Sequence, residues 1–521
     1  MPDAEIHGRH GTSYAGPASR RRRSALAVPV AAGPPWEGRW NGIGPAAAPG
    51  PSSPTATASG LALGSWEEMK HYDLVVLGAG SGNMLLDPET AHLRTAIVEP
   101  SRFGGTCLNR GCIPSKMFVV AADAATAARS AKRLGVHATV DHVDWKAIRD
   151  RVFGRIDPLH DSAVAYRRLA TDVYTEPARF VSPTVVEVGS QRISSEAFVV
   201  AVGARPVVPA IPGLEDVPFH TSDTIMRIDE VPESLVIVGG GFIAAELGYV
   251  FGALGSNVTI VQRGPRLLPQ EDEQVSARFT ELAAERHRLL LNTEVMSVEA
   301  RGQGVAVHVA GAAGREPGET VEAAALLVAV GRRPNTDRLD AAAVGLELDE
   351  HGHIVTDDAY RTSVPGIWSL GDAANHFQLK HMANAEVRVV RHNLLHPDDI
   401  RTLAPRLVPH AVFSDPQVAS VGLTERQARE RGIDCLIGVR DYADTAYGWA
   451  LENSTSFVKV LADPRDRTLI GAHIIGPQAA TLIQPLIQAM TLGLTVDQIA
   501  REVLYIHPAL TEVVEQALLA L

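Results

Sequence analysis

The stretch Gly104–Lys116 reads GGTCLNRGCIPSK and holds two of the three cysteines of the 521-residue chain, Cys107 and Cys112. Residues five apart in an ideal α-helix have Cα atoms about 8.6 Å apart, whereas a disulfide needs less than about 7 Å. A bond between the two sulfurs therefore requires a distorted turn, which Gly111 and Asn109 can supply. The alternative is two buried cysteines that pack as small apolar residues, and it leaves the flanking glycines and lysine unexplained.

Composition limits the chemistry of this pair. Hydrophobic residues make up 45% of the chain and charged residues 21%, which is typical of a globular protein, and the net charge of −12 argues against non-specific nucleic-acid binding. Three cysteines in 521 residues do not form a disulfide-stapled secreted protein. A close pair in such a chain is redox-active or metal-binding, and no second pair or histidine cluster completes a metal site. Cys435 is isolated and is interpreted as a thiol without function. We expect a cytoplasmic protein without a membrane span, since no apolar run reaches eighteen residues.

The first 68 residues differ from the rest. They are rich in Pro, Gly, Ala and Ser and contain the basic run Arg20–Arg23. We predict a disordered extension that is dispensable or absent from a natural chain beginning at Met69. An export signal is the alternative, but Pro29 cuts its apolar segment short.

A first nucleotide-binding unit follows. The apolar strand Asp73–Leu77 runs into the turn GAGSGN of residues 78–83, and a second strand, Thr95–Glu99, ends in an acid. A helix that Pro88 shortens or bends is expected between the strands. This order is the dinucleotide-binding fingerprint, although Asn83 replaces the third glycine. The glycines admit a pyrophosphate, and the acid accepts hydrogen bonds from a ribose. The residues expected to bind nucleotide here are Gly78, Gly80, Ser81 and Glu99.

A second unit repeats the pattern more closely. The strand Ser234–Val238 leads into GGGFIAAE of residues 239–246, and the next strand is Asn257–Val261. Gln262 occupies the position of the acid that favours NAD, and Arg263 and Arg266 follow it. Arginines there can hold the 2′-phosphate of NADPH, which we therefore predict as the hydride donor; the alternative is that they are solvated surface charges. The residues expected to bind nucleotide here are Gly239, Gly241, Phe242 and Arg263.

Three further strands end in glycine turns. Phe198–Val202 precedes Gly203 and Leu326–Val330 precedes Gly331, and both turns are expected where the chain crosses between domains. The strand ending at Leu370 precedes Gly371 and Asp372, which places one carboxylate at a strand tip near a ligand.

Near the C-terminus, Glu512 lies five residues after His507 in the segment HPALTE. A carboxylate that orients an imidazole fixes its tautomer and raises its basicity. Most of the 19 histidines are expected to be structural or solvent-facing, but this arrangement favours a base.

Together these motifs resemble the flavin-dependent pyridine-nucleotide–disulfide oxidoreductases over residues 71–521. That family includes glutathione reductase, dihydrolipoyl dehydrogenase, mercuric reductase and mycothione reductase. The resemblance implies an α/β fold with two Rossmann-like dinucleotide-binding domains, for FAD and NAD(P), and a C-terminal α+β dimerisation domain. The implied boundaries are 69–212 and 335–403 for the two parts of the FAD domain, 213–334 for the NAD(P)H domain and 404–521 for the dimerisation domain.

The resemblance also implies site roles. Cys112 becomes a thiolate against the flavin, Cys107 attacks the substrate disulfide, and His507 with Glu512 reaches into the active site of the partner subunit of a homodimer. Other implied site residues are Lys116 near the flavin, paired with Glu246; Thr106, Gly203, Gly331, Gly371 and Asp372 beside the cofactors; and Phe242 as a gate over the flavin. Arg110 is expected to hold thiolate charge or to face solvent.

Within the family, five stretches are most similar to the mycothione reductases. They are residues 80–83 (GSGN), 151–158 (RVFGRIDP), 220–228 (HTSDTIMRI), 446–450 (AYGWA) and 482–490 (LIQPLIQAM). We therefore predict NADPH-dependent reduction of a low-molecular-weight disulfide, mycothione, in cell redox homeostasis. Dihydrolipoyl dehydrogenase and glutathione reductase are the alternative enzymes, and a nucleotide-binding flavoprotein scaffold without turnover is the non-enzyme alternative. Mercuric reductase and the larger thioredoxin reductases need an extra C-terminal redox pair, which this chain lacks.

Overall fold

The computed structural model describes residues 69–311, 318–403 and 407–521, whose strands form five sheets. The predicted extension of residues 1–68 lies outside the described residues. No helix in the described part of the chain has both the length and the hydrophobicity needed to cross a membrane.

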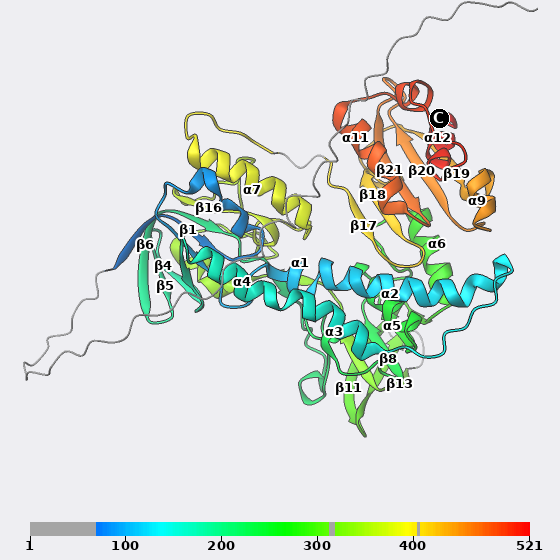
Figure 1. Ribbon diagram of the computed structural model, residues 1–521, viewed down its shortest axis with the longest axis horizontal. Helices are drawn as coiled ribbons and strands as arrows, with labels where there is room; N and C mark the ends of the chain where they lie inside the picture. The colour runs from blue at the N-terminus through cyan, green and yellow to red at the C-terminus, as the bar shows by residue number, and fades with distance from the viewer. Residues whose placement is uncertain (1–68, 312–317, 404–406) are drawn as a thin grey trace, which may run out of the picture. The chain divides into compact units, whose positions relative to one another are not determined.

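The first sheet is built around β1 (Lys70–Leu77), whose neighbours β2 and β6 both run parallel to it (Figure 1). The strand order is β3-β2-β1-β6-β5-β4, and β16 also pairs with β6. The apolar runs of β1 and β2 are buried, as expected for parallel strands covered on both faces. The other strands are β2 (Thr95–Val98), β3 (Asp172–Tyr174), β4 (Ala178–Ser182), β5 (Val185–Val188), β6 (Gln191–Val200) and β16 (Ile367–Ser369).

The connection between β1 and β2 corrects one prediction. The expected α-helix is absent, and two 3₁₀ turns replace it, η1 (Gly82–Leu85) and η2 (Pro88–Thr90). Pro88 has no N–H to donate, and the Asp87 side chain caps η2 by accepting from the backbone N–H of Glu89 at 2.9 Å. The proline therefore starts a new short turn and does not merely shorten a helix.

The helices that follow β2 anchor the cysteine stretch in the core. They are α1 (Gly105–Arg110), α2 (Cys112–Ser130), α3 (Trp145–Ile156) and α4 (Pro158–Arg167). Phe118 of α2 stacks on Trp145 of α3 with ring centroids 4.9 Å apart, and Trp145 also packs against Phe251 at 5.3 Å. Since Phe251 belongs to the next unit, α2 is held between the two nucleotide-binding units.

The second sheet is wholly parallel, in the order β10-β9-β8-β14. Its strands are β8 (Ser234–Val238), β9 (Asn257–Gln262), β10 (Arg288–Leu291) and β14 (Ala325–Val328), with helices α5 (Phe242–Ala253) and α6 (Glu273–Ala284). An antiparallel sheet of β11 (Thr293–Arg301), β12 (Gly304–Gly311) and β13 (Glu319–Ala323) is inserted before β14. The chain leaving β6 and the chain leaving β14 pair with each other as β7 (Ala204–Pro206) and β15 (Arg332–Pro334). The two crossing segments that follow Gly203 and Gly331 thus lie side by side.

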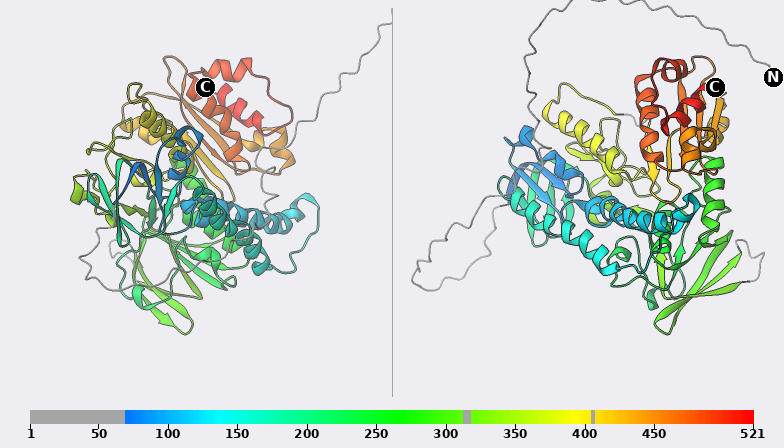
Figure 2. Two further views of the ribbon diagram at one scale, coloured as in Figure 1. Left: turned by 60° about the vertical axis from the view of Figure 1, so that its left-hand side comes forward. Right: turned by 45° about the vertical axis from the view of Figure 1, so that its right-hand side comes forward.

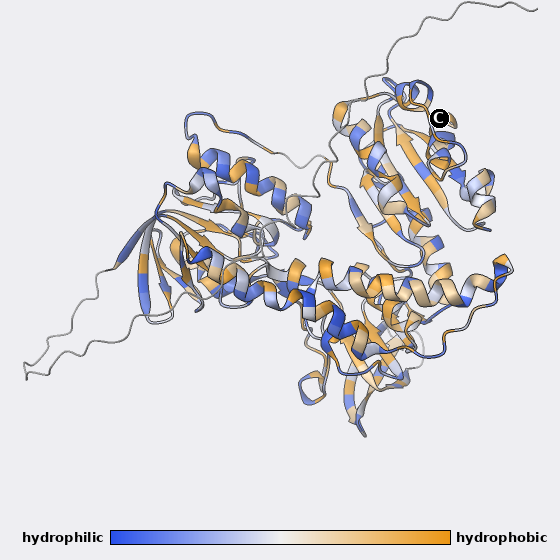
Figure 3. Cartoon of the chain, viewed as in Figure 1, coloured by the Kyte–Doolittle hydropathy of each residue, from blue (hydrophilic) through white to orange (hydrophobic). Residues whose placement is uncertain are grey.

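The C-terminal sheet is antiparallel, in the order β17-β18-β21-β20-β19. Figure 2 shows this domain, coloured orange to red, from two further sides. Its central strands are largely apolar (Figure 3), and β20 is buried along its whole length. The strands are β17 (His410–Val412), β18 (Val418–Gly422), β19 (Leu436–Asp441), β20 (Phe457–Ala462) and β21 (Leu469–Ile475). The remaining helices are α7 (Lys380–Leu395), α8 (Glu425–Glu430), α9 (Ala446–Ala450), α10 (Ala479–Leu482), α11 (Gln484–Leu492) and α12 (Thr511–Leu519).

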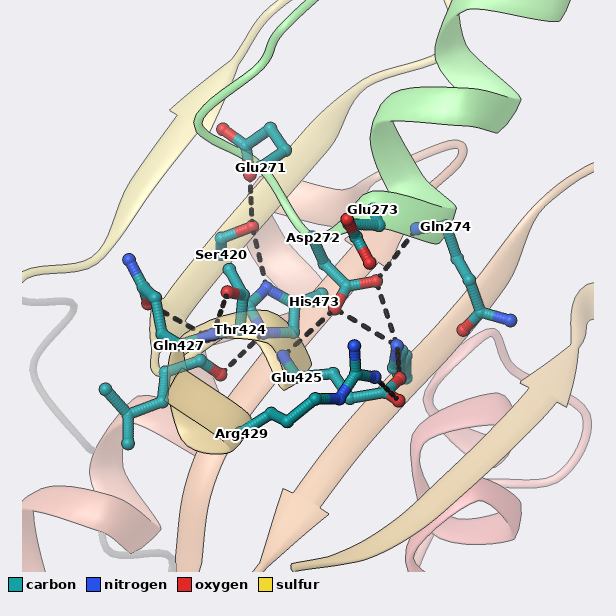
Figure 4. A network of polar contacts seen from close by, with 12 residues as sticks. Glu271, Asp272, Glu273, Gln274, Ser420, Thr424, Glu425, Gln427, Arg429 and His473 are labelled. Carbon is teal, nitrogen blue, oxygen red and sulfur yellow. Dashed lines mark hydrogen bonds and ion pairs between the residues drawn. The ribbon is translucent and has the colours of Figure 1, made fainter. Parts of the chain in front are cut away.

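A buried polar network attaches α6 to the C-terminal sheet (Figure 4). The Lys459 ammonium donates to both carboxylate oxygens of Asp272 at 3.0 Å and to Glu425 at 2.7 Å. Asp272 also caps α6 by accepting from the backbone N–H of Gln274 at 3.1 Å. Lys459 and Asp272 are 1% and 0% exposed, so each charge depends on the other for its stabilisation.

Lys459→Met is expected to destabilise the fold strongly. Removing the ammonium leaves the Asp272 carboxylate buried without a counter-charge, which costs about 3 to 5 kcal/mol of unfolding free energy. Urea unfolding followed by circular dichroism measures this loss. The matched control is Lys146→Met, because Lys146 pairs with Asp150 on the exposed face of α3 and its removal should change stability little. Equal stabilities of the two variants would contradict the importance of the buried pair.

Candidate active site

The two cysteines lie on either side of a helix break. Cys107 is in α1, Cys112 is the first residue of α2, and Gly111 between them has φ −136° and ψ −120°. A Cβ atom at Gly111 would lie 3.0 Å from the carbonyl oxygen of Thr106, closer than a side chain fits comfortably. The distorted turn expected from the cysteine spacing is therefore present, and glycine is what allows the chain to turn so close to the preceding helix.

Asn109 braces this turn. The residue is buried, and its side-chain amide donates to the carbonyl oxygens of Phe103 at 3.0 Å and Gly105 at 2.9 Å. These bonds tie the Asn109 side chain to the backbone carbonyl groups at the start of α1, which supply the partners that a buried amide needs. The asparagine thus fixes the position of the segment that carries Cys107.

The two sulfurs are unlinked thiols that interact with each other. The hydrogen bond from Cys107, together with the nearby Lys116 charge, lowers the pKa of Cys112 to about 7. The same hydrogen bond and burial raise the pKa of Cys107. When the pair loses one proton, the negative charge therefore settles first on Cys112, which is the more exposed of the two.

The ion pair predicted between Lys116 and Glu246 is present. The Lys116 ammonium lies 2.6 Å and 2.5 Å from the two carboxylate oxygens of Glu246, which is buried in α5. Glu246 also accepts from the backbone N–H of Phe413 at 3.0 Å, and the ammonium lies 4.6 Å from the centre of that ring. One carboxylate thus contacts α2, α5 and the segment after β17.

The glycines of the first turn let its backbone pack closely against neighbouring segments. Gly78 has φ +109°, and a Cβ there would lie 2.3 Å from the carbonyl oxygen of Ala201. Gly80 packs on Gly105 at the start of α1, where an added Cβ would lie 2.7 Å from the Gly80 Cα. Glu99 accepts from the backbone N–H of Ala79 at 2.8 Å, which fixes its carboxylate at the end of β2. Ser81 lies at the same turn, beside α7.

Asp372 lies just after β16, where the sequence predicted a carboxylate near a ligand. It belongs to the 3₁₀ turn η8 (Gly371–Ala373) after β16, and burial raises its pKa. Its side chain makes no hydrogen bond or ion pair to any residue in the described ranges, whereas the backbone N–H of Gly371 is already bound to Glu386 at 2.5 Å. A half-buried carboxylate without a protein partner fits the hydroxyl groups of an FAD chain, so the residues of this unit fit that cofactor.

The second glycine turn has the same design. A Cβ at Gly239 would lie 2.3 Å from the carbonyl oxygen of Ala329, and Gly241 caps α5. Phe242, the first residue of α5, is 48% exposed. The Gln262 side chain folds back to donate to the carbonyl of Arg266 at 3.3 Å. Arg263 is exposed and makes no ion pair within the described part of the chain, so its charge is available to a phosphate.

His507 and Glu512 form the predicted pair but lie apart from the thiols. The Nδ1 atom of His507 is 2.7 Å from a Glu512 oxygen, and the His507 side chain is 73% exposed. No hydrogen bond or ion pair in the described ranges joins His507 to Cys107 or Cys112. The side chains before it are also exposed, with Leu504 at 99% and Ile506 at 74%.

Two contacts of the site were missed from the sequence. Arg110, for which thiolate binding and solvent exposure were both open, forms an ion pair with Asp223 at 3.2 Å and donates to Ser101 at 2.8 Å. Lys380, the first residue of α7, donates to Ser81 at 2.9 Å beside the redox pair. Its only sequence signal was a lysine at the start of a helix soon after the Gly371-Asp372 turn.

Comparison with known proteins agrees with the family resemblance of the sequence. Residues 72–387 match the family model described as pyridine nucleotide-disulphide oxidoreductase, and residues 408–518 match the dimerisation domain of that family. The chain is 47% identical to mycothione reductase of Mycobacterium tuberculosis over 466 residues, which are 87% of this chain and all of that protein. It is 33% identical over 462 residues to dihydrolipoyl dehydrogenase of Haloferax volcanii, covering 85% of this chain and 95% of that one.

A solved structure supports this grouping. The HOCl-induced flavoprotein disulfide reductase RclA of Escherichia coli superposes with a TM-score of 0.76 at 27% identity, covering 86% of this chain and 99% of that one. Its α/β architecture agrees with the predicted fold class, and the C-terminal match agrees with a dimerisation domain. The chain therefore belongs to the pyridine nucleotide-disulphide oxidoreductases, a family of disulfide reductases that use FAD and NAD(P)H.

Proposed function

We propose that this protein is a mycothione reductase, which uses NADPH to reduce mycothione, the disulfide of mycothiol. The supporting observation is the 47% identity to mycothione reductase over all of that protein, compared with 33% to dihydrolipoyl dehydrogenase. The reaction consumes one NADPH, one proton and one disulfide, and it yields NADP⁺ and two thiols.

The proposed chemistry runs through the two cysteines. The first glycine turn, Glu99 and Asp372 would hold FAD, which would supply the two-electron chemistry that links NADPH oxidation to opening of the Cys107–Cys112 disulfide. The Cys107 thiolate then attacks one sulfur of the substrate, breaking the S–S bond and forming a mixed disulfide. His507 protonates the departing thiolate. Cys112 attacks the Cys107 sulfur, releases the second thiol and restores the disulfide.

Charge distribution supports this division of roles. Cys112 has the lower pKa and lies next to the Lys116–Glu246 pair, so it suits the thiolate that remains beside the flavin. Phe242, exposed at the start of α5, is proposed to gate the nicotinamide site by moving sterically. Thr106, Gly203 and Gly331 are proposed to line the cofactor sites.

The base is proposed to come from the second subunit of a homodimer. His507 is exposed and oriented by Glu512, and the domain that carries it matches a dimerisation domain. We propose the domain boundaries 69–212, 213–334, 335–403 and 404–521 and a cytoplasmic location for this dimer.

Replacing Arg263 and Arg266 with alanine is expected to raise the KM for NADPH about tenfold or more and to leave the KM for NADH unchanged. The reason is that charge-assisted bonds to a phosphate contribute about 1.5 to 3 kcal/mol. Steady-state kinetics with both nucleotides measure the effect. Arg301→Ala is the control, because Arg301 pairs with Glu322 on an exposed strand of the same unit. An unchanged KM for NADPH would assign the two arginines to the solvated surface.

A substrate panel tests the whole proposal. NADPH and NADH oxidation are followed with mycothione, glutathione disulfide and lipoamide, and mycothione with NADPH should have the highest kcat/KM. Lipoamide with NADH as the best pair would identify a dihydrolipoyl dehydrogenase, which the relative at 33% identity keeps as the second candidate. Absence of any disulfide-dependent oxidation would leave only a nucleotide-binding scaffold.

A further inference from the structure

Lys380 holds a cation beside the redox pair without a carboxylate partner in the described ranges. Its ammonium donates to the Ser81 hydroxyl at 2.9 Å, and that hydroxyl donates to Asn384, one turn further along α7, at 3.3 Å. Ser81 therefore fixes the side chain against the first glycine turn. Because Gly80 packs directly on Gly105, this turn is in contact with α1, which carries Cys107.

Two other cations of this region are already paired with carboxylates. Lys116 is paired with Glu246 at 2.5 Å and Arg110 with Asp223 at 3.2 Å. Arg332 donates to the carbonyl oxygen of Ala204 at 2.6 Å. Arg332 also donates to the Thr106 hydroxyl at 3.4 Å and, like Lys380, has no carboxylate partner in the described residues. The Ser81 hydroxyl is the only hydrogen-bond partner of Lys380 there, and Cys107, which does not act on Arg332, is among the anionic groups that act on Lys380, with Cys112 and Asp372.

Partial burial increases the need of Lys380 for a nearby anion. The Lys380 ammonium is half-buried, and desolvation lowers its pKa. A desolvated cation is stable only near an anion. Among the groups that act on Lys380, Cys107 has the largest favourable effect, followed by Cys112 and then Asp372. The titratable and charged groups around the pair are Lys380 and Asp372 near α7, and Lys116, Glu246 and Arg332 near Cys112.

We propose that Lys380 is an electrostatic positioning residue of the dithiol, whose ammonium stabilises the single negative charge of the reduced Cys107–Cys112 pair. This inference rests on the proposed dithiol chemistry. When the disulfide gains two electrons and one proton, the pair carries one thiolate; Lys380 acts on Cys107, whereas Lys116 acts on Cys112. The cation thereby keeps Cys107 able to share the charge and to act as a nucleophile.

The test is the pH dependence of thiol alkylation in the FAD-loaded protein. Wild type and Lys380→Met are reduced with dithiothreitol, freed of it, and treated with iodoacetamide from pH 5 to pH 10 as an experimental range; mass spectrometry locates the label. A cation beside a thiolate lowers its pKa by about one unit or more, so Lys380→Met should raise the apparent pKa of alkylation by about one unit. Alkylation near neutral pH should be about tenfold slower in the variant.

Control variants separate charge from structure. Lys380→Arg should keep the wild-type profile, because it retains the cation, and Lys132→Met, which removes an exposed lysine on another segment, should change nothing. If Lys380→Met does not fold, Lys380→Gln replaces it as the variant that removes the charge. FAD content is measured in every variant by absorbance after denaturation.

Three results would overturn the proposal. They are an unchanged alkylation profile in Lys380→Met, an equal shift in Lys380→Arg, or a loss of FAD whose replacement restores the wild-type profile, which would make Lys380 a cofactor anchor. Because dithiothreitol reduces the thiols directly, the measured alkylation profile does not depend on NADPH turnover. Failure of the proposed function would appear separately, as a wild-type protein in which NADPH exposes no alkylatable thiols.

Discussion

Cys107→Ser is expected to lower the rate of disulfide reduction by more than about a thousandfold, because the nucleophile that forms the mixed disulfide is lost. Electron transfer from NADPH to the flavin does not use this sulfur, so bleaching of the flavin by NADPH should persist. Stopped-flow absorbance separates the two steps, and steady-state oxidation of NADPH with mycothione measures the overall loss.

The Cys107→Ser and Cys112→Ser variants should differ in their flavin absorbance spectra. Cys107→Ser leaves the Cys112 thiolate beside the flavin, which should produce a long-wavelength charge-transfer band, and Cys112→Ser should abolish that band. In the reduced wild-type enzyme the hydrogen bond from Cys107 lowers the pKa of Cys112 to about 7. The band should therefore be weak well below pH 7 and grow as the pH rises through that value.

Cys435→Ser is the matched control, since this cysteine lies outside the redox pair, and its activity and spectrum should equal those of wild type. A Cys107→Ser enzyme that still reduces disulfides at a comparable rate would exclude the dithiol mechanism. A band retained in Cys112→Ser would reverse the roles given to the two sulfurs.

His507→Ala is expected to slow mycothione reduction by about a hundredfold to ten-thousandfold, the usual contribution of a general acid–base group. Glu512→Gln, which keeps the shape of the partner that lies 2.7 Å from the imidazole, should lose less. Flavin reduction by NADPH should be unaffected in both variants, because the imidazole acts only on the substrate side. Rapid-mixing kinetics of the two half-reactions measure these effects.

Mixed dimers test whether the site is shared. Neither Cys107→Ser nor His507→Ala homodimers should be active, but a dimer with one subunit of each kind contains one site with intact Cys107 and intact His507 from opposite chains. Random mixing during co-expression should therefore recover about a quarter of wild-type activity. No recovery in verified mixed dimers would show that each chain uses its own histidine.

The parts of the fold that could be predicted are those set by local pattern. A run of apolar residues before a glycine turn predicts a buried strand whatever surrounds it, so β1, β8 and β16 lie where expected. The His507–Glu512 pair could also be predicted, because His507 lies in the short loop before α12 and Glu512 lies in the first turn of that helix. The break at Gly111 followed from the distance that two cysteines must span.

Other features depend on chain segments far apart in the sequence. Arg110 finds Asp223, and Lys380 finds Ser81, only after α1, α7 and the first glycine turn have packed together. No spacing rule relates such residues. The missing helix after Gly82 had a local cause in Pro88 and the Asp87 cap, but the dinucleotide-binding pattern outweighed it in the prediction.

The exposed segment around Leu504 and Ile506 has a consequence for kinetics. In the proposed homodimer, His507 is supplied by the partner subunit, so the complete catalytic machinery would exist only in the associated protein. Specific activity then becomes a function of the enzyme's own concentration. Progress curves started from very dilute stock should show a lag that disappears as the stock concentration rises. The length of the lag would then measure how fast two chains associate.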